Sequence, residues 1–151
     1  MKHHSYLVIS GPNLDYHGST EGSAKAEESL DGIHADLLTR AQELGVTVEC
    51  MQSNREGDFI DALQSAPDRF DGIIINGGAL AQFSYTLRNA IESALLPCIE
   101  VQISNVHAHE STCHTSVLAP VCVGVIGGFG KTGYLLALDA LVNITTEPTV
   151  Y

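Results

Sequence analysis

Short apolar runs alternate along the chain with segments of helical periodicity, and this alternation constrains the fold more than any other feature. Runs without internal polar alternation are typical of strands buried on both faces. A helix between successive strands is typical of parallel connections. We therefore predict a single α/β domain over residues 1–151, with a doubly wound, five-stranded parallel sheet. The predicted strands span 6–10, 46–51, 72–76, 97–101 and 121–127, and the predicted helices 29–44, 56–66, 83–95 and 131–142.

Polar residues follow the predicted strands, and the fold predicts that they meet. The arrangement is typical of the flavodoxin-like fold, whose functional crevice lies at the carboxyl ends of the strands. Each polar residue alone would be an ordinary turn or cap, but their convergence favours a small-molecule site. Residues 18–29 are small and polar, and we predict that they form a lid over this crevice. The strand-end residues include Asn13, Asp15, Asn76, Glu100, Gln102 and Ser104.

The charge balance excludes several classes of partner. The 151 residues include 18 acidic and 7 basic side chains, which give a formal net charge of −11. Such a surface repels phosphate backbones and anionic lipid, so we predict neither a nucleic-acid partner nor a membrane partner. The N-terminal segment leads directly into the first strand, and no apolar stretch reaches the roughly 18 residues of a membrane span. We therefore expect a cytoplasmic protein.

The cysteine, histidine and glycine patterns favour neither a metal nor a cofactor. Of Cys50, Cys98, Cys113 and Cys122, three lie in or beside apolar runs, where buried free thiols are the default. Residues 107–114 follow an H-x-H-x3-C-H pattern, but no second group of spaced ligands completes a tetrahedral site. The glycines of 128–133 imitate a dinucleotide motif after the wrong strand, so we expect them to pack the following helix tightly.

Several long sequence blocks carry a family resemblance. The chain resembles the type II 3-dehydroquinate dehydratases over nearly its whole length, with the blocks in family order and at family spacing. The resemblance implies a flavodoxin-like fold and a cofactor-independent reaction. It also implies a homo-oligomer, a dodecamer built from trimers, with each active site near a trimer interface. The blocks are SGPNL (10–14), QSNREGDFIDAL (52–63), IINGGAL (74–80), TLRNAI (86–91), PCIEVQISNVHAHE (97–110) and GVIGGFGKTGYLLAL (124–138).

Proton-transfer positions of the family carry other residues here. In the family a lid tyrosine, activated by a lid arginine, removes a proton beside the substrate ketone, and a histidine protonates the departing hydroxyl. The resemblance places Lys25 at the lid tyrosine, Thr20 at the lid arginine and Gln102 at the histidine. An amide neither gains nor loses a proton near neutral pH. Four further replacements stand where the family has a histidine, an interfacial aspartate and two arginines: Gln82, Asn89, His109 and Cys113.

The residues that anchor the substrate in the family are retained. The resemblance assigns Asn13 to the water that stabilises the enolate, and the amides of Ile103 and Ser104 to the substrate carboxylate. Asn76 and Glu100 are also retained. A pocket with its anchors kept and its proton-transfer groups replaced indicates altered chemistry, because loss of one acid or base alone removes a factor of roughly 10² to 10⁴.

We therefore predict a diverged lyase that acts on another small or polyketide-type carboxylate or ketone by elimination, isomerisation or cyclisation. The alternatives are a non-catalytic binding or scaffold protein, and a 3-dehydroquinate dehydratase of the shikimate pathway with reduced activity. The predicted catalytic residues are Asn13, Asp15, Tyr16, Lys25, Glu100 and His109; the predicted substrate-binding residues are Asn76, Gln82, Asn89, Gln102, Ile103, Ser104 and Cys113.

Overall fold

A parallel sheet forms the centre of the molecule. The computed structural model describes residues 2–12, 29–105 and 115–147. The sheet is five-stranded with the order β2-β1-β3-β4-β5, and each pair of neighbouring strands is parallel. The strands are β1 (Ser5–Ser10), β2 (Thr47–Gln52), β3 (Gly72–Asn76), β4 (Cys98–Gln102) and β5 (Gly124–Gly127).

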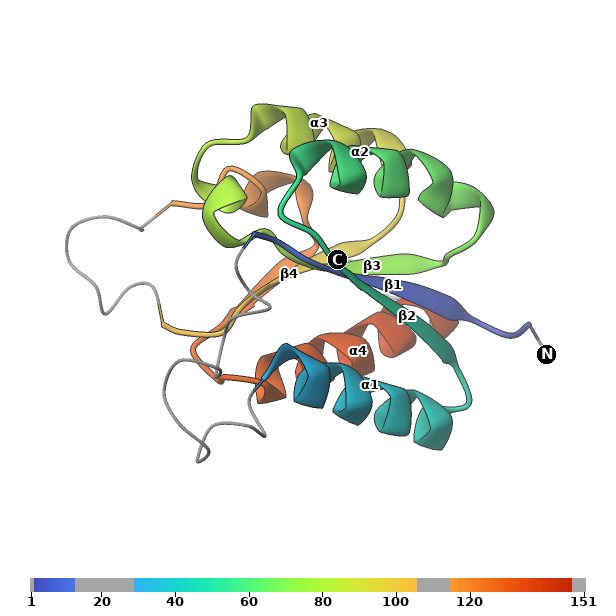
Figure 1. The fold of residues 1–151 in the computed structure, drawn as a ribbon. Helices are drawn as coiled ribbons and strands as arrows, with labels where there is room; N and C mark the ends of the chain where they lie inside the picture. Colours follow the sequence, from blue (N-terminus) through green and yellow to red (C-terminus); the bar gives the residue numbers. More distant parts are fainter. Residues whose placement is uncertain (1, 13–28, 106–114, 148–151) are drawn as a thin grey trace.

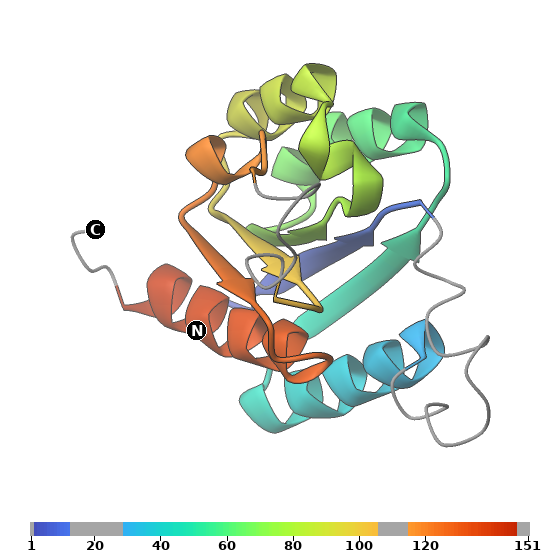
Figure 2. The same ribbon diagram turned by 90° about the vertical axis from the view of Figure 1, so that its left-hand side faces the viewer.

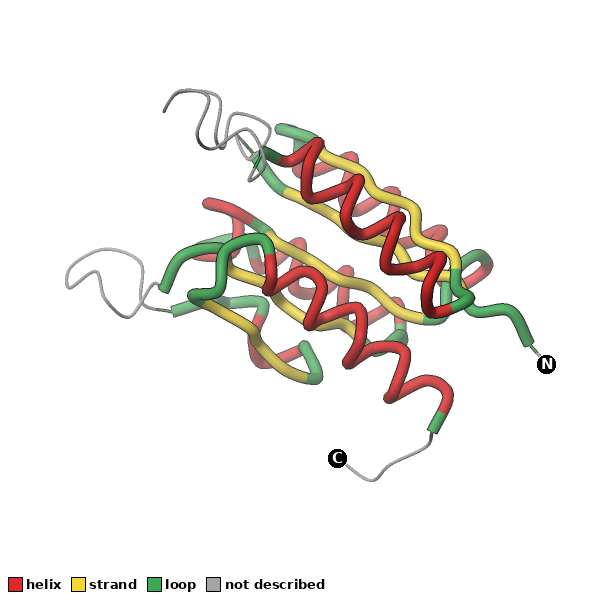
Figure 3. Tube along the Cα trace, turned by 90° about the horizontal axis from the view of Figure 1, so that it is seen from below, coloured by secondary structure: helices red, strands yellow, loops and turns green. Residues whose placement is uncertain are grey.

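Helices cover both faces of this sheet. Helices α1 (Leu30–Leu44) and α4 (Thr132–Thr146) lie on one face, and α2 (Glu56–Ser65) and α3 (Tyr85–Ala94) lie on the other (Figure 1). Seen from below, the helices run along the strands that they cover (Figure 3). The three layers and the strand order confirm the predicted flavodoxin-like, doubly wound fold. None of the described helices is long and apolar enough to cross a membrane.

The central strands supply the core to both faces. In β3, Ile73 and Ile75 pack toward the α2 and α3 side, whereas Ile74 packs with the α1 and α4 side, and all three are fully buried. The edge strands do not follow this pattern. Strand β2 alternates exposed and buried residues in its first half, and β5 contains no buried residue. Burial on both faces was therefore predicted correctly for the interior strands and wrongly for the edges, because an edge strand has one neighbour only.

Local signals define where the helices begin and end. The Ser29 hydroxyl accepts a hydrogen bond from the Gly32 amide at 3.2 Å and caps α1, and Gly45 ends that helix in the left-handed region at φ 70°. Ser84 caps α3 in the same way through the Leu87 amide. Ser29 thus belongs to the helix start, and the rest of the predicted lid, residues 18–28, lies outside the described residues.

The last strand is shorter than predicted. We expected it over 121–127, but it comprises Gly124–Gly127 and is preceded by a 3-10 turn, η6 (Ala119–Val121). Pro120, the second residue of this turn, has its backbone φ already set, and the Val121 amide donates to the Leu118 carbonyl instead of to a strand. The apolar run was therefore read as strand where proline chemistry produces a turn.

Candidate active site

The carboxyl edge of the sheet collects polar groups from three adjacent strands. Ser10, at the end of β1, pairs in register with Asn76 at the end of β3, and Glu100 of β4 pairs with Ile75. This edge faces the viewer in Figure 2. The connection after β1 leads to α1 on one face, and the connection after β3 leads to α3 on the other. Such a switch in direction opens a crevice between neighbouring strands, which is where ligands bind in doubly wound folds.

Asn76 is fixed at this switch point by hydrogen bonds to both its side chain and its backbone. Its side-chain oxygen accepts a hydrogen bond from the Gly78 amide at 3.1 Å, and its carbonyl accepts from the Gly11 amide at 2.8 Å. The side chain is buried and also interacts with the phenol of Tyr134. Asn76 is therefore a rigid polar group between two chain reversals.

Tyr134 lies beneath this position in the first turn of α4. Its hydroxyl is 3.1 Å from that of Ser10, and both side chains are fully buried. Burial raises the pKa of Tyr134 above its ordinary value, while the hydrogen bonds with Ser10 and Asn76 oppose that rise. The phenol consequently stays neutral and serves as a fixed hydrogen-bonding group.

Glu100 is a buried carboxyl group on the adjacent strand. It is 1% exposed, and its Oε2 accepts a hydrogen bond from the Ser116 hydroxyl at 2.6 Å. Burial raises the pKa of Glu100, and hydrogen bonds with Ser116 and Gln102 act against the rise. Its Oε1 is buried and accepts no hydrogen bond of good geometry within the described part of the chain. This carboxyl group therefore favours its neutral form more than an exposed glutamate does.

The segment after β4 is supported by the glycine-rich loop. The amides of Gly128 and Gly130 donate to the carbonyls of Gln102 and Ile103, at 3.2 and 2.9 Å. Ile103 packs partly into the core, whereas Ser104 is exposed at the edge. The structure thus brings Gln102, Ile103 and Ser104 together with Asn76 and Glu100 along the carboxyl edge.

The glycine motif itself serves packing. A Cβ atom on Gly133 would lie 3.3 Å from the Val101 side chain and 3.5 Å from that of Ile126, so α4 packs closely on β4 and β5 at this glycine. This contact confirms the expected helix packing for Gly133, whereas Gly128 and Gly130 adopt positive φ values of 93° and 56° in the loop before the helix. Within the described residues, no group of three or more histidine, cysteine, aspartate or glutamate side chains is arranged to hold a metal.

Two further predicted substrate-binding residues, Gln82 and Asn89, lie on the surface of the described chain. Gln82 is exposed at the end of the 3-10 helix η4 (Gly78–Gln82), which the sequence did not predict. Asn89 lies on the exposed side of α3 and lines a surface groove of about 380 Å³ with Leu63 and Pro67. Asn89 therefore belongs to the surface between α2 and α3, apart from the strand ends.

The other histidine and cysteine residues of the cluster at 107–114 lie outside the described part of the chain. So do the remaining predicted site residues: Asn13, Asp15, Tyr16, Lys25, His109 and Cys113. The sequence reasoning also missed two site residues, Ser116 and Tyr134. Ser116 stands just before Ala119-Pro120, a spacing typical of a serine that caps a turn, and this signal could have found it. No local signal marks Tyr134.

The fold and this edge define a class of protein: a flavodoxin-like α/β protein with polar side chains gathered at the switch point of its sheet. Residues 4–142 match the family model described as dehydroquinase class II. The protein belongs to this family.

Several known relatives agree with that assignment. The chain is 47% identical to a 3-dehydroquinate dehydratase of Bacillus cereus over 141 residues, which cover 93% of this chain and 97% of the relative. Among solved structures, it is similar to a type II dehydroquinase from Butyrivibrio crossotus, with a TM-score of 0.87, 41% identity and coverage of 93% of this chain and 98% of the other. It is also similar to a 3-dehydroquinate dehydratase-like protein from Bifidobacterium longum, with a TM-score of 0.70, 29% identity and coverage of 95% and 99%.

These comparisons correct the predicted function. The prediction of a diverged lyase, isomerase or cyclase with another substrate is wrong, because nearly half of the aligned residues are shared with 3-dehydroquinate dehydratases across both chains. The alternative of a dehydratase fits better, and the protein is an enzyme of the carbon–oxygen lyase class. The error came from giving a few replaced positions more weight than the whole chain. Loss of one proton-transfer group lowers a rate without abolishing the reaction.

Proposed function

We propose that the protein is a 3-dehydroquinate dehydratase of the shikimate pathway. The observation that carries this proposal is the 47% identity to a dehydratase of this name over 93% of the chain and 97% of the relative. The reaction removes a proton beside the substrate ketone and expels a hydroxyl group as water, which leaves a conjugated enone.

The carboxyl edge supplies the polar groups that such a substrate needs. Asn76 presents a fixed amide at the switch point, and the chain after β4 presents Gln102, Ile103 and Ser104 from a segment held by two glycine amides. We assign these four residues to substrate binding. Eight further candidates enter the proposal from the sequence alone: Asn13, Asp15, Tyr16, Lys25, Gln82, Asn89, His109 and Cys113.

We expect a lower rate than that of a relative with a titratable residue at position 102. A glutamine side chain cannot donate a proton to a leaving hydroxyl. Removal of one acid or base typically lowers a rate by a factor of roughly 10² to 10⁴. The proposed activity is therefore dehydration at reduced rate, with binding of the substrate retained.

The test is to mix purified protein with 3-dehydroquinate and follow the growth of enone absorbance, with the Bacillus cereus relative assayed beside it. Measurable turnover that depends on Asn76 and Gln102 is expected. Asn76→Ala and Gln102→Ala should raise KM, and Gln42→Ala is a matched control on the exposed side of α1. Absence of turnover at high enzyme concentration, in protein that is folded by circular dichroism, would overturn the proposal.

We also propose that the protein is a cytoplasmic homo-oligomer, a dodecamer built from trimers. The support is the family resemblance of the sequence blocks. Light scattering coupled to size-exclusion chromatography measures the mass directly, and a monomer of 16.1 kDa at micromolar concentration would contradict it.

A further inference from the structure

The dehydration needs a proton donor, and a buried carboxyl group, that of Glu100, lies at the carboxyl edge. This inference rests on the proposed function. A hydroxyl group departs readily only when its oxygen receives a proton as the carbon–oxygen bond breaks. Gln102 has no proton of suitable acidity, but Glu100 lies two residues earlier on the same face of β4.

Ser116 determines which oxygen of Glu100 carries a proton. A serine hydroxyl has one hydrogen to donate and two lone pairs to accept with. Both lone pairs of Ser116 are used, because its oxygen accepts from the amides of Leu118 and Ala119 at 3.1 and 3.2 Å. The hydroxyl hydrogen must therefore point to Oε2 of Glu100, 2.6 Å away. A proton on the Glu100 carboxyl group must therefore be bound to Oε1.

The surroundings of Oε1 favour that proton. This oxygen is buried without a hydrogen-bond donor of good geometry in the described residues, and a bare carboxylate oxygen in such a place is costly. Burial is the largest influence on the pKa of Glu100 and raises it, while the hydrogen bonds with Ser116 and Gln102 offset part of that rise. No cation is paired with this carboxyl group among the ion pairs of the described residues.

We propose that Glu100 is the proton donor of the dehydration, that it holds the proton on Oε1, and that Ser116 is the positioning residue that places it there. Because Glu100 is 1% exposed, one water molecule between Oε1 and the substrate passes the proton on, with the Gln102 amide as its second partner. The Oε1–H bond breaks, the carbon–oxygen bond breaks with its electrons on oxygen, and the hydroxyl leaves as water. The proton taken from the carbon beside the ketone balances the one that Glu100 gives up, so no oxidant or reductant is needed.

The first test measures the protonation of Glu100 in the absence of substrate. Infrared difference spectra between the wild-type protein and Glu100→Gln, recorded over a series of pH values, should contain a carboxylic acid carbonyl band that shifts in D2O and persists to higher pH than that of an exposed glutamic acid. Glu92→Gln, an exposed glutamate on α3, is the matched control and should leave that band in place. Replacement of this band by a carboxylate band at the pH where an exposed glutamic acid ionises would overturn the inference, whatever the enzyme does with 3-dehydroquinate.

The second test reads the donor during turnover. Glu100→Gln should lower kcat by a factor of about 10² or more with KM changed only a few-fold. Ser116→Ala removes a hydrogen bond that favours the ionised form, so the alkaline limb of kcat/KM should move to higher pH. Ser116→Thr keeps the hydroxyl, so the alkaline limb of its kcat/KM profile should lie at the wild-type pH. The Ser116 variants keep the inference testable even if Glu100→Gln folds poorly.

The results separate this inference from the proposed function. Turnover by the wild-type protein with Glu100→Gln equally active would overturn the donor role and leave the dehydratase proposal standing. A wild-type protein without turnover but with the Glu100-dependent acid band would overturn the dehydratase proposal and support the protonation of Glu100. Turnover that falls with Glu100→Gln, together with the shifted limb in Ser116→Ala, is the expected result.

Discussion

The phenol hydroxyl of Tyr134 lies 3.1 Å from the hydroxyl of Ser10, which joins the first turn of α4 to the end of β1 across 124 residues of chain. Tyr134→Phe removes this bond and the contact with Asn76, and leaves buried polar groups without a partner. Unfolding free energy should fall by about 1–3 kcal/mol in urea titrations. Tyr85→Phe, on an exposed ring of α3, should change it by less than about 0.5 kcal/mol. Equal midpoints for the two variants would show that the buried phenol contributes nothing.

Gly11 and Gly77 approach closely where β1 and β3 end. A Cβ atom on Gly11 would overlap the carbonyl oxygen of Gly77, which is backbone and cannot turn aside. Gly11→Ala should therefore destabilise the protein by about 1–3 kcal/mol and disturb Asn76, with a rise in KM. Gly57→Ala is the control, since nothing lies within 4 Å of its Cβ position in α2, and it should stabilise by about 0.5–1 kcal/mol. Thermal or urea unfolding of both variants tests the difference, and a Gly11→Ala protein as stable as the wild type would contradict the overlap.

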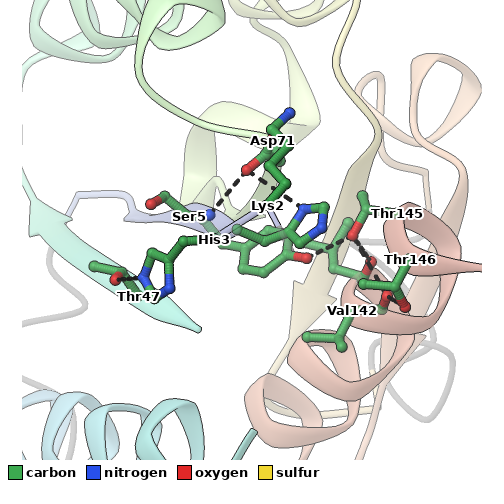
Figure 4. Close-up of polar contacts among 11 residues, drawn as sticks. Lys2, His3, Ser5, Thr47, Asp71, Val142, Thr145 and Thr146 are labelled. Atoms are coloured by element: carbon green, nitrogen blue, oxygen red, sulfur yellow. Dashed lines mark hydrogen bonds and ion pairs between the residues drawn. The ribbon is translucent and has the colours of Figure 1, made fainter. Parts of the chain in front are cut away.

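Asp71 anchors the start of β1 at the opposite edge of the sheet (Figure 4). Its carboxyl group accepts from the Lys2 ammonium and the Ser5 amide, each at 2.9 Å. Burial alone would raise the pKa of Asp71, but these two hydrogen bonds and the charges of Lys2 and His4 together outweigh it, so the pKa is lowered.

A carboxyl group with a lowered pKa stabilises the folded state above its unfolded pKa of about 3.9 and loses that contribution as pH falls through the folded value. Asp71→Asn should therefore cost on the order of 1 kcal/mol at pH 7, and the difference from wild type should shrink below about pH 4. Urea titrations at pH 7, 5 and 3 measure it, with the exposed Asp68→Asn as control. A difference that stays constant over this range would contradict the assigned pKa.

Cysteine reactivity should differ sharply between the folded and unfolded protein. Burial raises the pKa of Cys50 to about 12, and Cys98 is fully buried with its pKa raised by a hydrogen bond with Cys122 and by burial. The thiolate is the reactive form, so neither thiol should react with iodoacetamide at pH 8 in native protein within minutes. Mass spectrometry of labelled peptides with and without urea checks this. Rapid native labelling of Cys50 would contradict its burial.

Most elements of the fold could be predicted from local pattern. The spacing of Leu30, Ile33 and Leu37 predicted α1, and all three are buried on its inner side. The run at 72–76 predicted β3 at its observed bounds. The exposure of the edge strands could not be predicted, because β2 and β5 lie at the edges only through the order of the sheet.

The candidate site was predicted in part. Asn76, Glu100 and Gln102 were chosen because parallel strands bring their carboxyl ends to one edge, and they do lie there. The family resemblance assigned Asn89 to a role across a subunit interface, and in this chain it lines a groove between α2 and α3, so that role stays a prediction. The roles of all these residues remain predictions until the variants above are measured.

By itself the sequence determined the period of its apolar residues, the caps at Ser29 and Ser84, and the family, because each depends on neighbours in the chain or on matched blocks. Only the tertiary structure decided that Ser116 directs its hydroxyl to Glu100 and that Tyr134 meets Ser10. These pairs are 16 and 124 residues apart, and no local propensity encodes them. They form because helix and strand packing brings polar groups into a place without water, where each must find a partner in the protein.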